Sequence, residues 1–409
     1  MDDLTSPSSL VMIAVAAVVA PIIAERLRRW RIPSVLFELL LGILIGPALL
    51  GWAEVTPFID AIAQLGLYFL MFLAGYEIQF ERVKGPPLKL ASFGWLLSLL
   101  LGLGLALPLV LTGFALSDLL IGLAVTTTAI GTLLPMLRDR DLLDTPFGRY
   151  ALAGGAAGEF GPILAITVLL SDDSPGKAVA YLAVFVTAAV LVALISVRSQ
   201  PPAVVAALQK HLTTSTQLPV RIVVALLALM VYLAFELDLD VLLGAFTAGM
   251  LVRLAIPPST VHVVEEKVEA IGFGFLIPIF FIVSGMEFDL ASLGDPNTLA
   301  RVPLFLGMFL VVRGLPVLLL YRKVLDGPAR RALAILQATA LPLVVVITTI
   351  GIDSGDMLTS NAAALVGAGM LSVLLFPMIG FKVLAGSAMA PSPNPKTGDE
   401  DATEVNDGL

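Results

Sequence analysis

Glu159 is the side chain of this sequence whose type and position could do chemistry at membrane depth. It lies halfway along an apolar run that also contains Gly158, Gly161 and Pro162. A charged side chain at the centre of a bilayer costs on the order of 3 kcal/mol, so it usually faces a cavity or a partner. A lone carboxylate that faces a cavity can bind a proton or a cation, and the two compete for it. We therefore predict that Glu159 is a shared proton and cation site, and that Gly158 and Gly161 break its helix.

Arg313 is a second charge at a similar depth. Glu159 follows Gly148 by 11 residues, roughly 16 Å along a helix, and Arg313 lies as far from Val302. A guanidinium at that level needs an anion or several carbonyls around it. We predict that Arg313 is the charge partner of Glu159 or gates its site. An inert buried ion pair is the alternative.

Threonine and glutamine oxygens in two other apolar segments could complete a cation site. A Gly or Pro break in each segment frees backbone carbonyls and presents the ends of helix dipoles. We predict that the two helices are discontinuous and cross, although threonines in membrane helices often bond back to their own helix. The predicted ligands are Thr127 and Thr128 before a break at Gly131, and Gln337 and Thr339 before a break at Pro342.

The composition is that of an all-α polytopic integral membrane protein. Of the 409 residues, 58% are hydrophobic and 14% are charged, which is more apolar side chain than a soluble core can bury. The absence of cysteine excludes thiol chemistry, and the two histidines argue against a histidine metal site or a catalytic triad. We therefore predict no enzyme activity, no cofactor, no resident metal and no nucleic-acid partner.

About thirteen segments are long and apolar enough to be membrane helices. They span residues 8–24, 34–50, 59–75, 88–112, 116–135, 148–170, 178–197, 218–235, 241–256, 271–286, 302–321, 332–350 and 361–384. Basic residues gather in the connections after the odd-numbered segments, and the opposite connections are acidic or neutral. The positive-inside rule then predicts an outside N-terminus and a cytoplasmic C-terminus, in a prokaryotic-type plasma membrane.

The membrane domain, residues 1–388, contains a predicted internal repeat. Gly75 and Gly285 end similar stretches 210 positions apart, and Thr128 and Thr339 are 211 apart. Partners seven helices apart cross the membrane in opposite senses, which indicates inverted-topology repeats with a site at the midplane. The repeats span about 34–170 and 218–384, with a linker at 198–217. Residues 389–409 form an acidic cytoplasmic tail that is predicted to be disordered.

Several motifs resemble the monovalent cation:proton antiporter superfamily, in particular its Kef-type potassium and NapA-type sodium exchangers. The resemblance covers the whole membrane region and implies a homodimer, a mobile core domain with crossed broken helices, and an elevator-like movement. That family carries a pair such as Asp-Asp, Asn-Asp or Gln-Asp where this chain has Gly158-Glu159. Glu159 alone therefore carries over, and Arg313 falls at a basic position of the family. The motifs are Ile32-Pro33-Ser34-Val35, Leu41-Gly42-Ile43-Leu44-Ile45-Gly46-Pro47, Phe72-Leu73-Ala74-Gly75-Tyr76-Glu77-Ile78, Thr127-Thr128-Ala129-Ile130 and Phe280-Phe281-Ile282-Val283-Ser284-Gly285-Met286.

The expected function is a secondary antiporter that exchanges Na⁺ or K⁺ for protons by alternating access. Two alternatives stay open. Arg313 could hold the carboxylate of an organic anion in a cation-coupled carrier. The missing aspartate also allows a membrane sensor of the same fold that no longer transports.

Overall fold

The computed structural model describes residues 7–27, 32–78, 83–138, 140–169, 175–198, 216–256 and 261–387. Within these ranges the chain is helical and contains no strand. The helices are α1 (Pro7–Arg26), α2 (Ser34–Ile45), α3 (Pro57–Glu77), α5 (Pro86–Leu111), α6 (Asp118–Ala124), α7 (Ile130–Arg138), α8 (Pro146–Leu169), α9 (Pro175–Arg198), α11 (Leu218–Glu236), α12 (Val241–Ala255), α13 (Val261–Ile271), α14 (Ile277–Met286), α15 (Pro296–Leu320), α16 (Gly327–Gln337), α17 (Pro342–Asp353) and α18 (Thr359–Leu384).

The prediction of an all-α polytopic membrane protein is confirmed. Ten helical stretches in the described residues are long and apolar enough to cross a membrane, and α2 and α12 are shorter apolar helices. The predicted membrane helix at 116–135 is divided into α6 and α7, and the one at 332–350 is divided into α16 and α17. Residues 199–215 of the predicted linker and the acidic tail lie outside the described residues.

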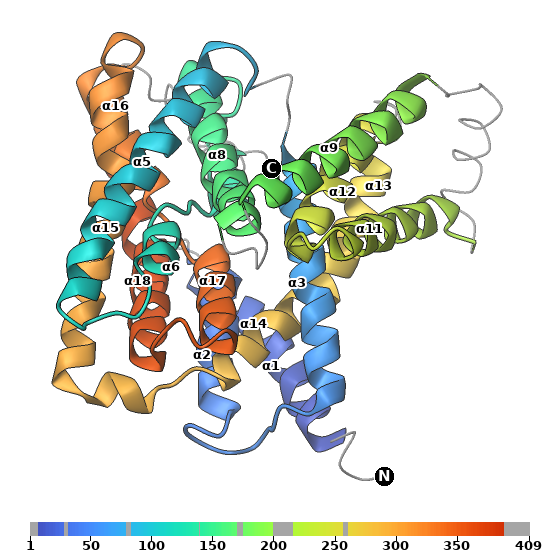
Figure 1. Ribbon diagram of the computed structural model, residues 1–409. Coiled ribbons are helices and arrows are strands. Elements are labelled where there is room, and N and C mark those ends of the chain that lie inside the picture. The colour runs from blue at the N-terminus through green and yellow to red at the C-terminus, as the bar shows by residue number, and fades with distance from the viewer. Residues whose placement is uncertain are drawn as a thin grey trace, which may run out of the picture.

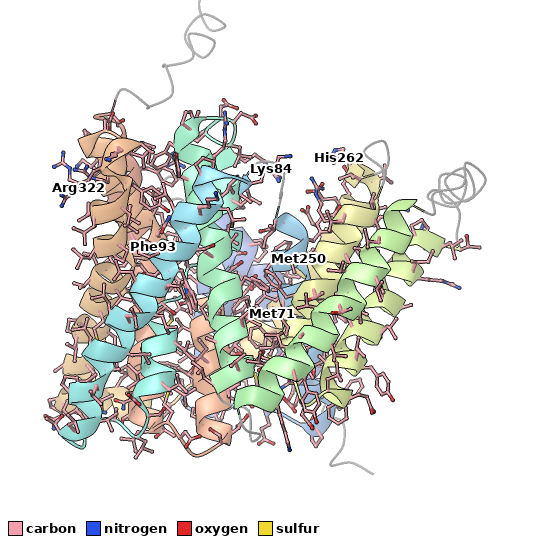
Figure 2. All side chains as sticks on the ribbon, turned by 45° about the horizontal axis from the view of Figure 1, so that its top comes forward. Met71, Lys84, Phe93, Met250, His262 and Arg322 are labelled. Atoms are coloured by element: carbon pink, nitrogen blue, oxygen red, sulfur yellow. The ribbon has the colours of Figure 1, made fainter. Side chains whose placement is uncertain are left out.

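The helices pack mainly within two bundles (Figure 1). The crossing bundle contains α5 to α8 and α15 to α18, and the flanking bundle contains α1 to α3, α9 and α11 to α14. Their outer faces carry exposed apolar side chains such as Phe93, whereas Lys84, His262 and Arg322 lie at one end of the molecule (Figure 2). The apolar outer faces suit contact with lipid, and the charged end suits a membrane surface.

Two close helix–helix contacts in the flanking bundle depend on glycine. A Cβ at Gly249 of α12 would overlap the carbonyl oxygen of Phe72 in α3, and a Cβ at Gly42 of α2 would overlap that of Ile282 in α14. Small residues let helix backbones approach this closely in membranes. Each of these two contacts joins a helix from one half of the chain to a helix from the other half.

Gly249→Ala is expected to destabilise the protein by about 1–3 kcal/mol, because a methyl group there forces the backbones of α3 and α12 apart. The control is Gly104→Ala in α5, where a Cβ meets open space. That change should be neutral or stabilising by up to about 1 kcal/mol, since alanine favours the helix. Thermal unfolding of both variants in detergent measures the difference. Equal melting temperatures would show that the glycine contact is not needed.

Four helix boundaries differ by five or more residues from those predicted, and two of these are the earlier starts of α15 at Pro296 and α16 at Gly327. The segment predicted to end at Leu50 stops at Ile45, because Gly46 is in extended conformation and Pro47 follows it without an N–H to continue the helix. The segment predicted to begin at Ile271 extends back to Val261 through a π-helical turn at Gly272–Leu276.

Candidate functional site

The two interrupted helices meet backbone to backbone. The amide of Ala129, between α6 and α7, donates to the carbonyl of Thr339, between α16 and α17, at 2.8 Å. The Thr128 hydroxyl donates to the carbonyl of Gln337, the last residue of α16. These bonds satisfy backbone groups that each interruption leaves without helical partners. The two interruptions therefore cross, and we call this contact the crossing.

The two interruptions differ in their local hydrogen bonding. Pro342 is the first residue of α17 and has no N–H to continue α16. In the other chain segment α6 ends at Ala124, and the hydroxyls of Thr126 and Thr127 donate to the carbonyls of Leu123 and Ala124, at 2.7 and 2.8 Å. The donor of Thr127 is therefore used within its own segment. Gly131 is the second residue of α7, so this interruption lies just before it.

Glu159 lies at the positive end of α7. Its side chain is 6% exposed, and Oε1 accepts a hydrogen bond from the amide of Ile130, the first residue of α7, at 3.1 Å. Oε2 has no hydrogen-bond partner within the protein. A negative charge at a helix N-terminus is favourable because it faces the unpaired amides and the positive end of the dipole. The carboxylate is thus held by one oxygen and keeps the other available for a ligand.

Arg313 does not pair with Glu159, so the predicted charge pair is wrong. The guanidinium, 2% exposed, donates through Nε to Thr128 Oγ1 and through Nη2 to the carbonyl of Gly154, both at 2.8 Å. Longer bonds reach Ser98 Oγ at 3.4 Å and Gln337 Oε1 at 3.5 Å.

The crossing itself separates the two charges. Arg313 lies beside the C-terminal end of α16, where a helix dipole is negative, and Glu159 lies beside the N-terminal end of α7, where a dipole is positive. Each charge is therefore compensated by backbone groups of the crossing. Arg313 links helices α5, α8, α15 and α16 to the interruption at Thr128, and so holds the crossing bundle together.

Gly158 and Gly161 do not break their helix, contrary to prediction. Helix α8 is continuous from Pro146 to Leu169. A Cβ at Gly158 would lie 2.6 Å from the Thr128 side chain and 2.7 Å from Arg313 Nη2, and one at Gly161 would overlap the ring of Trp95. The Gly158 carbonyl accepts from the amide of Thr128 at 3.1 Å. These glycines thus allow other groups to lie close to α8: Trp95 lies at Gly161, and Thr128 and Arg313 lie at Gly158.

The predicted ligand residues divide into two groups. Thr128 and Gln337 bond to Arg313, whereas Glu159 lines a cavity that is also lined by the predicted break residues Gly131 and Pro342. Thr339 Oγ1 and Gln337 Nε2 are buried without a hydrogen-bond partner within the protein.

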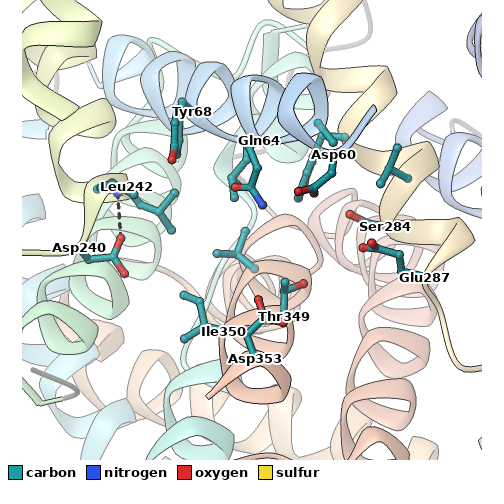
Figure 3. Close-up of a pocket in the computed structure, with 16 residues that line it drawn as sticks. Asp60, Gln64, Tyr68, Asp240, Leu242, Ser284, Glu287, Thr349, Ile350 and Asp353 are labelled. Atoms are coloured by element: carbon teal, nitrogen blue, oxygen red, sulfur yellow. Dashed lines mark hydrogen bonds between the residues drawn. The ribbon is translucent and has the colours of Figure 1, made fainter. Parts of the chain in front are cut away.

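Two cavities approach the crossing from opposite ends. The larger, about 830 Å³, contains Glu159, Gly131 and Pro342 and extends to Arg138 at the end of α7. The smaller, about 310 Å³, lies between α3, α12, α14 and α17 (Figure 3). Its lining includes the carboxylates Asp60, Asp240, Glu287 and Asp353, and Glu159 is not part of it. Of these two cavities, the larger contains Glu159 and the smaller does not.

Glu287 directly follows α14 and lines the smaller cavity (Figure 3). Burial, together with the nearby charges of Asp60 and Asp353, raises the pKa of its carboxyl group above the usual value. The four carboxylates that line this cavity gather acidic groups at one place, which favours the approach of cations.

Sequence reasoning missed Glu77, the last residue of α3. The end of a predicted helix is a typical surface position, yet Glu77 lines the larger cavity, and its Oε2 is buried without a hydrogen-bond partner. The available signal was its position directly after the repeated Gly75 motif, which packs against α12 inside the protein.

Comparisons with known proteins agree with this architecture. The family model described as "Sodium/hydrogen exchanger, transmembrane" matches residues 13–386. A putative Na⁺/H⁺ antiporter of Bacillus subtilis, YjbQ, is 29% identical over 397 residues, covering 91% of this chain and 62% of its own length. A Na⁺/H⁺ antiporter of Enterococcus hirae is 27% identical over 281 residues, covering 66% of this chain and 70% of its own.

A solved structure has the same fold. The sodium proton antiporter MjNhaP1 of Methanocaldococcus jannaschii superimposes with a TM-score of 0.63 at 16% identity, covering 92% of this chain and 97% of that one. The chain spans less than two thirds of the length of the Bacillus relative.

Proposed function

Because the chain belongs to the transmembrane sodium/hydrogen exchanger family, we propose that it exchanges Na⁺ or K⁺ for protons across the membrane. The observation that carries this proposal is the state of Glu159. One oxygen is held by the amide of Ile130, and the other faces a cavity without a partner in the protein. A carboxylate held in this way can accept a cation or a proton, and each excludes the other.

Competition for one carboxylate produces exchange if the empty, charged site does not reorient. Each reorientation then carries either a proton or a cation, so the two move in opposite directions. The two cavities at opposite ends of the crossing support alternating access, with the crossing bundle moving against the flanking bundle. Here Glu159 is open to the cavity that ends at Arg138.

The remaining predicted residues have supporting roles. Thr339 Oγ1 and backbone carbonyls of the interruptions are candidate ligands that could assist Glu159. Thr127, Thr128 and Gln337 shape the crossing through their hydrogen bonds, and Arg313 holds it together. Arg313 lines neither cavity, which argues against its binding an organic anion.

The proposed setting is a prokaryotic-type plasma membrane with the N-terminus outside and the Arg138 end cytoplasmic. The gathering of Lys84, His262 and Arg322 at one end supports this orientation (Figure 2). We also propose a homodimer and the division into repeats 34–170 and 218–384. The paired glycine contacts support the repeat, and the exposed apolar faces of α1 and α9 offer a surface for lipid or a second copy.

Purified protein in proteoliposomes with an imposed pH gradient tests the exchange. Addition of NaCl or KCl is expected to move protons across the membrane, reported by a pH-sensitive dye, and choline chloride should have no effect. Empty liposomes serve as the control. Correctly folded protein that responds to none of Na⁺, K⁺ and Li⁺ would refute the proposal, and a response only to an organic anion would support the carrier alternative.

A further inference from the structure

Glu77 and Glu159 are two carboxylates in one cavity, and each has an oxygen without a hydrogen-bond partner in the protein. Burying a carboxylate in this way is unfavourable unless a cation or a proton compensates its charge. No ion pair compensates either residue in the described part of the chain: Arg138 acts on Glu77 only at longer range. Their burial is therefore unexplained by the fold itself.

The two carboxylates meet at the first turn of α7. Glu159 Oε1 accepts from the amide of Ile130 at 3.1 Å. A Cβ placed on the next residue, Gly131, would lie 3.8 Å from Glu77 Oε2. Arg313 makes no hydrogen bond to Glu159, whereas the carboxylate of Glu77 lies in the same cavity as that of Glu159. The two groups therefore repel each other, and a cation or a proton between them relieves that repulsion.

The carboxylates belong to different bundles. Glu77 ends α3 in the flanking bundle, and Glu159 lies in α8 of the crossing bundle. Alternating access moves such bundles relative to each other. A site made by both residues is therefore complete in the conformation described here and is taken apart when the crossing bundle moves.

We propose that Glu77 is a second ligand of the transported monovalent cation, which binds between Glu77 and Glu159 when the larger cavity is open. This inference rests on the proposed exchange function and adds a ligand from the opposite bundle. The N-terminal end of α7 and the charge of Arg138 offset part of the extra negative charge, while Glu265 and Glu269 on α13 add to it. The expected consequence is a higher cation affinity on this side of the membrane.

Glu77→Gln is expected to raise the apparent KM for Na⁺ or K⁺ at least about tenfold and to lower the maximal rate less than about threefold, because it removes binding and leaves Glu159 in place. Glu77→Asp, which keeps the charge on a shorter side chain, should give an intermediate KM. The matched control is Glu269→Gln, which removes a carboxylate from the same cavity. It should change KM less than about threefold, since it is not a ligand.

Three outcomes would overturn the inference. One is a Glu77→Gln variant with the KM of the wild type. Another is a rise of KM in Glu269→Gln equal to that in Glu77→Gln, which would indicate a general electrostatic effect of the cavity's carboxylates. The third applies if Glu77→Gln does not fold. The rise in melting temperature on adding NaCl or KCl in detergent is then compared between the wild type and Glu77→Asp, and an identical rise in both would overturn the inference. A wild type that exchanges no cation refutes the proposed function as well, whereas an active wild type with an unaffected KM refutes this inference alone.

Discussion

Glu159→Gln is expected to reduce cation-dependent proton movement in proteoliposomes at least about 100-fold, or about 2.7 kcal/mol at 1.36 kcal/mol per tenfold. Glutamine has nearly the shape of glutamate and retains an oxygen that can accept from the amide of Ile130. It can neither bind a proton at neutral pH nor offer a charge to a cation. Both halves of the exchange cycle are therefore blocked, and the packing around α8 is preserved.

Two comparisons make this result specific. Glu159→Gln should elute and melt like the wild type or better, because it removes a buried charge without removing its backbone partner. Glu159→Asp keeps the carboxylate on a side chain one methylene shorter, so it should retain partial exchange with altered cation affinity. If Glu159→Gln still exchanged cations for protons at the wild-type rate, the shared site would have to lie elsewhere.

Arg313→Met is expected to destabilise the protein by about 3–5 kcal/mol, the range found when one member of a buried charged network is removed. The carbonyl of Gly154 and the hydroxyl of Thr128 both lose a charged donor at 2.8 Å. The crossing then loses the side chain that joins it to α5, α8 and α15. Thermal unfolding in detergent measures the loss of stability, and the proteoliposome assay should show a parallel loss of exchange.

Arg313→Lys separates charge from geometry. Lysine retains the positive charge but cannot reach four acceptors with one planar group, so we expect a melting temperature between those of the wild type and Arg313→Met. Arg322→Met is the control for loss of an arginine, because Arg322 is exposed and bonds only to the carbonyl of Leu318 in its own turn. A melting temperature of Arg313→Met equal to that of Arg322→Met would show that Arg313 does not hold the crossing together.

The opposite placement of Arg313 and Glu159 explains how a crossing tolerates two charges at the same depth. Two interrupted helices present dipole ends of both signs within a small space. Glu159 lies at a positive end beside Ile130, and Arg313 lies at a negative end beside Gln337. An ion pair would neutralise Glu159 and remove it from competition between cation and proton, so its separation from Arg313 suits the proposed exchange.

The all-helical membrane architecture depends on local sequence and was predicted correctly. The apolar segments follow from length and hydropathy, because a bilayer of given thickness demands about 20 apolar residues per helix. An interruption in each of two segments was also predicted, and Pro342, which lacks an N–H, begins the helix that follows one of them. None of these properties requires knowledge of which helix is the neighbour.

Only the tertiary structure decided which groups face each other. Glycine often marks a helix break, but Gly158 lies in a continuous helix and is a contact point, because Thr128 and Arg313 occupy the space that a side chain would fill. Arg313 bonds to Thr128 at the crossing and not to Glu159. Glu77, from the other bundle, lines the same cavity as Glu159 although the two residues are 82 positions apart in sequence. A sequence thus determines the depth and the type of each polar group in a membrane helix. Its rotational position and its partners depend on how the helices pack, because neighbours on different helices leave no local pattern in the chain.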